Sequence, residues 1–159
     1  MKIFIRRDTS DIHSRFLVFD EYENKLYTVS GRSTASGELM KVFEGGFTVA
    51  KIRDLRLPVM EAYSVTIGNE SFKLFFTYRA GRLRPRFSGI SWRIRGDILL
   101  GSYDICDADG TIICSVCEHF SKNYTELSVY EKSRELFCIA CAICVSSQNV
   151  ERVPDLQPI

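Results

Sequence analysis

Apolar and polar residues alternate along most of the first 130 residues, a period of two that is typical of β-strands with one buried face. The alternation continues on both sides of Glu44-Gly45-Gly46, which is a hairpin signal. Similar breaks at residues 20–24, 68–69 and 107–110 contain Gly, Asn or Asp, which tolerate the positive φ of tight turns. The pattern therefore predicts an antiparallel meander.

The last 30 residues follow a different pattern. No Gly or Pro occurs between residues 132 and 148, and residues 136–145 are all apolar. This predicts a helix over 132–148 that is buried on every side, although a buried strand is an alternative for the apolar stretch. Ten helical residues rise only about 15 Å, too short for a bilayer. A barrel wrapped around a central helix would cover it, and residues 149–159 are expected to form a loose tail.

Length and composition indicate one domain, expected over residues 1–148. The chain has 159 residues, 45% of them hydrophobic, and a formal net charge of +1, which argues against a uniformly basic nucleic-acid binder. Its first residues lack a secretory signal, and no run reaches the about 18 apolar residues of a membrane span. A cytoplasmic location is therefore expected, with the six cysteines as reduced thiols.

Three blocks of sequence, followed by the apolar helix, resemble the LURP-one-related family. The blocks are FLVFDEYENKLYTVSG, SWRIRGD and YDICDADGTIICSV. This family belongs to the tubby C-terminal-like superfamily, which includes the phospholipid scramblases. The resemblance covers residues 2–148 and implies a mainly β fold, a twelve-stranded antiparallel barrel closed around a hydrophobic C-terminal helix. It aligns residues 92–97 with a W-x-I-x-G-D-like strand and residues 107–110 with a D-x-x-G turn. In tubby-like relatives the barrel binds phosphoinositide headgroups, but the basic positions that do so have no residue-by-residue match here.

The cysteines have metal-like spacings, C-x2-C at 114–117 and C-x2-C-x2-C at 138–144. Residues three apart in a strand point to opposite faces, and the second set lies in an apolar helix, so small core side chains are the expected role. A zinc or iron site and a redox thiol are the alternatives. Cys117 and His119 share a strand face, but nothing identifiable orients the imidazole. No catalytic motif occurs, and we expect neither enzymatic activity nor a cofactor.

Charge is distributed unevenly along the chain. Residues 71–96 contain seven basic residues and no acidic one. Five arginines alternate with apolar or small residues, so each strand would present its guanidinium groups on one face: Arg82, Arg84, Arg86, Arg93 and Arg95. Guanidinium forks suit phosphate.

Two functions are compatible with this arginine face. The first is a binding module, peripheral at the membrane, that meets an anionic membrane surface, a phosphoinositide headgroup or another phosphorylated ligand. The alternative is a structural or protein-interaction domain with no lipid ligand, in which the arginines are solvated and pair with acidic residues: Asp97, Asp104, Asp107 and Asp109. Nucleic acid could use the same arginines but is not an expected partner: stacking aromatics would be needed beside them, and while Tyr78 and Phe87 are nearby, Trp92 is expected to face the core.

Overall fold

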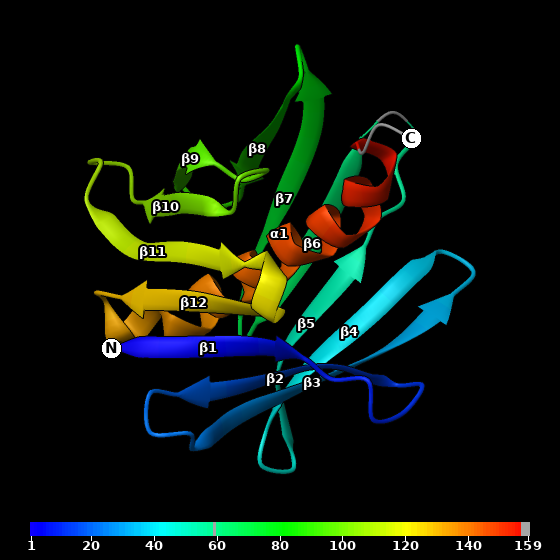
Figure 1. Ribbon diagram of the computed structural model, residues 1–159, viewed down its shortest axis with the longest axis vertical. Helices are drawn as coiled ribbons and strands as arrows, with labels where there is room; N and C mark the ends of the chain where they lie inside the picture. The colour runs from blue at the N-terminus through cyan, green and yellow to red at the C-terminus, as the bar shows by residue number, and fades with distance from the viewer. Residues whose placement is uncertain (59, 157–159) are drawn as a thin grey trace.

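Twelve strands and a long C-terminal helix make up the fold (Figure 1). The computed structural model describes residues 1–58 and 60–156, with side chains described as far as Gln148. The strands are β1 (Lys2–Arg7), β2 (Ser14–Asp20), β3 (Lys25–Thr34), β4 (Gly37–Glu44), β5 (Phe47–Asp54), β6 (Glu61–Ile67), β7 (Glu70–Arg79), β8 (Arg82–Ser88), β9 (Arg93–Asp97), β10 (Ser102–Cys106), β11 (Ile112–His119) and β12 (Tyr124–Val129). Helix α1 covers Glu135–Leu156, and two 3-10 turns cover Phe120–Lys122 and Lys132–Arg134.

The strands form one antiparallel sheet that curves into a nearly closed barrel. Their order is β8-β7-β6-β5-β4-β3-β2-β1-β12-β11-β10-β9, so the first strand, β1, pairs with the last, β12. The predicted twelve-stranded antiparallel barrel is confirmed. Closure is incomplete, because no strand pairing joins β8 to β9 in the part of the chain that the structure describes. These two strands are therefore the edges of the sheet.

The predicted turns lie where the alternation breaks. Gly45 and Gly68 have φ values of 62° and 59° in the β4–β5 and β6–β7 turns. The β2–β3 turn lacks a glycine, and there Glu23 takes the positive φ, at 65°. The Asp20 carboxylate stabilises this turn by accepting the N–H groups of Tyr22 and Asn24, both at 2.9 Å.

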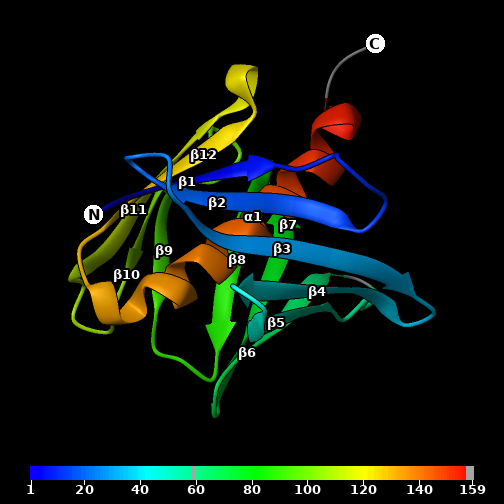
Figure 2. The same cartoon turned by 90° about the horizontal axis from the view of Figure 1, so that it is seen from below.

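Helix α1 fills the barrel, and Figures 1 and 2 show the curved sheet enclosing it. Every residue from Cys138 to Val145 has no exposed surface. A helix apolar on all faces needs cover on all faces, which the inward side chains of the strands supply.

The helix boundaries differ from the expected 132–148. Residues Lys132–Arg134 form a 3-10 turn, and the helix then continues to Leu156 through most of the segment expected to be a tail. The first proline after the apolar stretch is Pro154, so residues 149–153 keep the N–H groups that helical hydrogen bonds need. The remainder of the expected tail, residues 157–159, lies outside the described residues.

An aromatic cluster fixes the connection between the two edge strands. Trp92 lies in this connection and is buried, with ring centroids 6.2 Å from Phe87 of β8 and 5.9 Å from Phe137 of α1. Phe72 of β7 lies 6.0 Å from Phe87 and stacks on Phe137 at 6.0 Å. Aromatic pairs at these distances add stability beyond the area they bury. The cluster therefore holds one end of β8 and the start of β9 against the helix.

Candidate anionic-ligand site

The β7–β8 hairpin presents the first group of predicted arginines. Arg82, Arg84 and Arg86 are exposed on its outer face, while Leu83 is buried and Phe87 partly buried on the inner face. The turn is tight because Ala80 and Gly81 both have positive φ, 53° and 76°. Two-residue turns with two positive φ values match the twist of paired strands.

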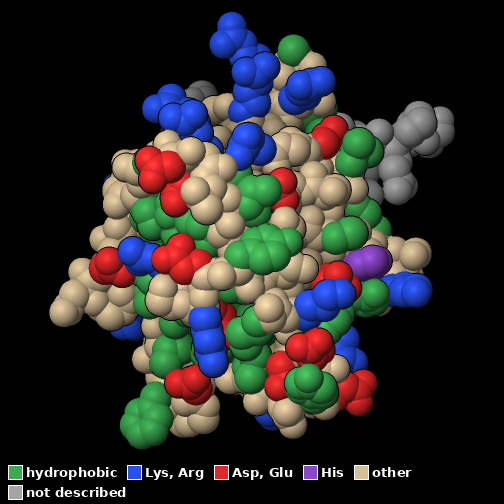
Figure 3. All heavy atoms as spheres, turned by 90° about the vertical axis from the view of Figure 1, so that its left-hand side faces the viewer, with side chains coloured by type: hydrophobic (Ala, Val, Ile, Leu, Met, Phe, Trp, Pro, Cys, Tyr) green, Lys and Arg blue, Asp and Glu red, His purple; other side chains and the backbone are tan. Residues whose placement is uncertain are grey.

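Strand register adds Arg79 to this group. Arg79 is exposed at the end of β7 and stands directly opposite Arg82. Like charges in a directly opposed cross-strand pair are destabilising. The hairpin thus concentrates positive charge at its tip, and in Figure 3 Lys and Arg side chains gather at the top of the visible face, the end from which this hairpin projects in Figure 1.

Strand β9 presents the remaining two arginines, which differ from each other. Arg93 is exposed, and within the described residues its side chain has no hydrogen bond or ion pair; the same holds for Arg82, Arg84 and Arg86. Arg95 is instead engaged by the neighbouring strands. Its guanidinium donates to the Gly110 carbonyl at 2.8 Å and to the Cys106 sulfur at 3.2 Å. The hydrogen bond to Cys106 is the main cause that raises the pKa of Arg95.

Three of the nearby acidic residues accept hydrogen bonds from groups other than the arginines. Asp97 accepts the backbone N–H of Leu99 at 3.0 Å, and Asp107 accepts those of Asp109 and Thr111 at 2.9 and 3.0 Å. Asp104 accepts the Ser115 hydroxyl at 2.6 Å. Across the described residues, no ion pair within 4 Å joins these carboxylates to the five arginines. Four guanidinium groups are therefore available to an external anion.

The cysteines lie as strand and helix geometry predicts. Cys114 of β11 is buried, whereas Cys117, three residues on, is exposed. The three cysteines of α1 are buried, and burial raises the pKa of Cys141 and Cys144. In the described part of the chain, no group of three or more His, Cys, Asp or Glu side chains is arranged to hold a metal ion. His119 stacks on Tyr124 with ring centroids 4.4 Å apart.

Thiol labelling should reflect this burial. In the native protein we expect Ellman's reagent to react rapidly with one thiol, that of Cys117, and with all six cysteines after unfolding in guanidinium. The Cys117→Ser variant should lose the rapid phase and keep five thiols in denaturant. Rapid labelling of two or more thiols in the native state would contradict the burial of the other five cysteines.

Comparison with known proteins gives the family of this fold. Residues 1–146 match the family described as LURP-one-related, so the chain belongs to that family. An X-ray structure of an Arabidopsis thaliana protein is similar, with a TM-score of 0.64 and 14% sequence identity over 93% of this chain and 91% of that one. At this identity the likeness concerns the fold. A search of curated proteins finds no match.

No helix among the described residues combines the length and apolar character that crossing a bilayer requires.

Proposed function

We propose that this LURP-one-related domain is a non-enzymatic, cytoplasmic binding module that meets anionic phospholipid through the outer face of β8 and β9. The observation that carries the proposal is the set of four exposed guanidinium groups without a protein partner among the described residues: Arg82, Arg84, Arg86 and Arg93. Arg79 opposite Arg82 adds to their potential. An anion at the hairpin tip would relieve the repulsion between these two like charges.

The charges set a modest affinity. Each basic residue near an anionic membrane surface contributes about 1 kcal/mol. Four such residues contribute about 4 kcal/mol when all reach one surface, which corresponds to a dissociation constant of about 1 mM. Binding of this kind is peripheral and falls as salt rises, because exposed charges are screened. Arg95 is left out of this sum, since two of its donors already bond to Gly110 and Cys106 and hold the side chain against β10.

Vesicle co-sedimentation tests the proposal. The wild type should bind phosphatidylcholine vesicles that contain phosphatidylserine, bind less at physiological than at low salt, and not bind phosphatidylcholine alone. The Arg82→Ser/Arg84→Ser/Arg86→Ser variant should bind about a hundredfold more weakly, since it loses three contributions of about 1 kcal/mol. Circular dichroism and thermal unfolding establish that the variant is folded.

A matched control separates this surface from net charge. The Lys25→Ser/Lys122→Ser/Lys132→Ser variant removes the same number of charges from exposed positions elsewhere and should bind nearly as the wild type does. Equal losses in the two variants would mean that binding follows overall charge. No binding by the folded wild type would remove the lipid function and direct the search to protein partners.

A further inference from the structure

A groove with a volume of about 250 Å³ lies on the outer face of β3 and β4, which are five and four strands away from β8 in the sheet order. Its lining combines cationic or titratable side chains with hydroxyl and apolar ones: His13, Ser30, Gly31, Arg32, Leu39, Lys41 and Phe43. No acidic side chain is among these residues. The groove is therefore a separate basic site, away from the arginine face.

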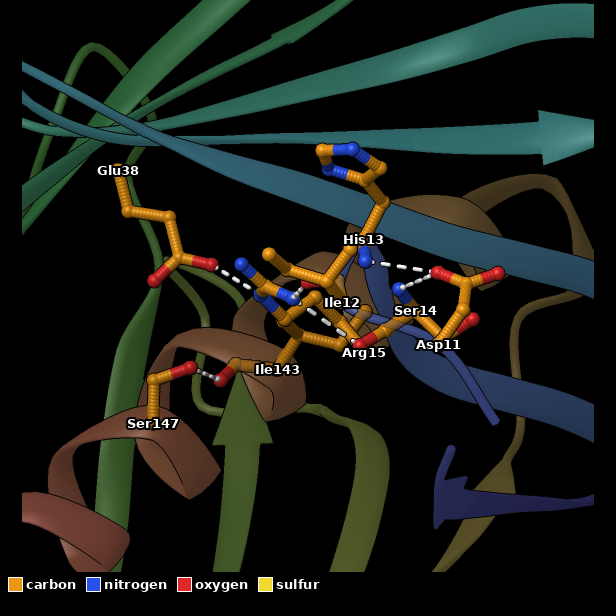
Figure 4. Close-up of polar contacts among 8 residues, drawn as sticks. All are labelled: Asp11, Ile12, His13, Ser14, Arg15, Glu38, Ile143 and Ser147. Atoms are coloured by element: carbon orange, nitrogen blue, oxygen red, sulfur yellow. Dashed lines mark hydrogen bonds and ion pairs between the residues drawn. The ribbon is translucent and has the colours of Figure 1, made fainter. Parts of the chain in front are cut away.

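The β1–β2 loop places His13 in this groove. The Asp11 carboxylate accepts the backbone N–H groups of His13 and Ser14 at 2.7 and 3.0 Å. The His13 carbonyl accepts the N–H of Gly31 at 2.8 Å, which ties the loop to β3. Figure 4 shows the imidazole pointing away from the Asp11 carboxylate. The ring is thus held beside β3, and among the described residues its nitrogens make no hydrogen bond.

Two acidic residues of this region have partners elsewhere. Glu38 pairs with Arg15, whose guanidinium also donates to the Ile12 carbonyl at 2.8 Å (Figure 4). Asp11 accepts the two backbone N–H groups described above through one carboxylate oxygen, Oδ1. Glu38 is thus paired with Arg15 of β2, Asp11 accepts within the β1–β2 loop, and no ion pair among the described residues joins a carboxylate to Arg32 or Lys41.

Strand register increases the positive charge around Lys41. Lys51 of β5 stands directly opposite Lys41, and Arg53 stands opposite Leu39. Arg32 of β3 lies on the other side of Leu39. Directly opposed like charges destabilise a sheet, and diagonal cross-strand neighbours are only about 7–8 Å apart. An anion in the groove would offset this repulsion.

We propose that the groove binds the phosphate group of a small phosphorylated molecule. Arg32 supplies a planar fork for two phosphate oxygens, Lys41 a mobile point charge, and His13 a ring nitrogen. Ser30 adds a hydroxyl, while Leu39 and Phe43 offer an apolar surface to the rest of the molecule. Its residues come from β3, β4 and the β1–β2 loop, so phosphate binding here does not depend on lipid binding at β8 and β9.

Titration with inorganic phosphate, followed by NMR of the full chain, tests the site. The His13 ring and the backbone amides of Ser30 to Arg32 should shift and saturate with phosphate. Sodium chloride at equal ionic strength should leave these chemical shifts unchanged. Pyrophosphate should bind more tightly than phosphate, because it meets more of the surrounding cations. Equal shifts with chloride, or shifts that do not saturate, would overturn the proposal by showing only screening.

Variants locate the site and separate it from lipid binding. Arg32→Ser/Lys41→Ser should weaken phosphate binding at least tenfold, whereas Arg82→Ser/Arg84→Ser/Arg86→Ser should leave it unchanged. The reverse order of effects would overturn the assignment. A lipid source is distinguished in the Arg82→Ser/Arg84→Ser/Arg86→Ser background, with vesicles containing a phosphatidylinositol phosphate. Vesicle binding in this background that is lost when Arg32→Ser/Lys41→Ser is added would identify the phosphate as a headgroup, and no vesicle binding in this background would identify it as that of a soluble molecule.

Discussion

Replacing Ile143 with Ala is expected to lower the free energy of unfolding by about 3 kcal/mol. Ile143 lies in the fully buried stretch of α1 and has no exposed surface. Strands that are hydrogen-bonded around the helix cannot easily collapse into the space that the lost methyl and methylene groups leave, so most of the cavity should remain. Urea unfolding followed by circular dichroism measures the change, as a shift of the midpoint at constant slope.

The same substitution at an exposed position provides the control. Ile12 lies in the β1–β2 loop with 81% of its surface exposed, so Ile12→Ala should change the free energy of unfolding by less than about 0.5 kcal/mol. The backbone carbonyl that receives Arg15 is unaffected by this change. A small effect for Ile143→Ala as well would mean that α1 does not fill the barrel in solution.

The position of this helix could be predicted from the sequence because its signal is local. Ten consecutive apolar residues without Gly or Pro leave few structural choices, and a cover on every side then requires the strands to surround them. The ends of the helix were harder to place. Whether Lys132–Arg134 makes a 3-10 or an α-turn depends on how β12 delivers the chain to the barrel, and one proline at position 154 does not determine where a helix stops.

The missing pairing between β8 and β9 could not be predicted, because no local feature of the sequence marks it. Both strands show the alternation of paired strands, and whether the last edges of a barrel meet depends on the tilt and stagger of all twelve. The face on which each arginine lies could be predicted, because alternation within a strand does not depend on the neighbouring strand. A period of two puts Arg82, Arg84 and Arg86 on one side of a strand whatever its neighbour is.

Pairings between distant residues account for what sequence reasoning missed in the sites. Arg95 reaches Gly110 across β10, an interaction that needs the register of two hairpins. Lys41 and Lys51 flank a recognisable turn, but their direct opposition depends on a register shift between Val42 and Phe43. His13 enters the groove only because its loop bonds to Gly31. A count of alternating cations on both arms of each predicted hairpin would have drawn attention to the pair of lysines.

Gly96→Ala is expected to destabilise the protein by about 3 kcal/mol, through strain at a backbone that glycine alone accommodates. Gly96 lies in β9 with a φ of 115°, in the W-x-I-x-G-D segment. A Cβ there would lie 2.6 Å from the Ser102 carbonyl oxygen and 2.8 Å from the Tyr103 Cα. Both are backbone atoms of the partner strand β10, so relief requires β9 to move away from it.

Gly46→Ala is the matched control for this change. Gly46 lies in the β4–β5 turn, and a Cβ there meets nothing within 4 Å, so its effect should stay within about 1 kcal/mol in either direction. Amide hydrogen exchange adds a local readout. Movement of β9 should speed exchange across the β9–β10 pairing and in the β10–β11 turn that Arg95 holds through Gly110, while β4 and β5 stay protected. Equal stability of the two variants, with unchanged exchange in β10, would show that β9 does not follow the close path along β10 that makes glycine necessary.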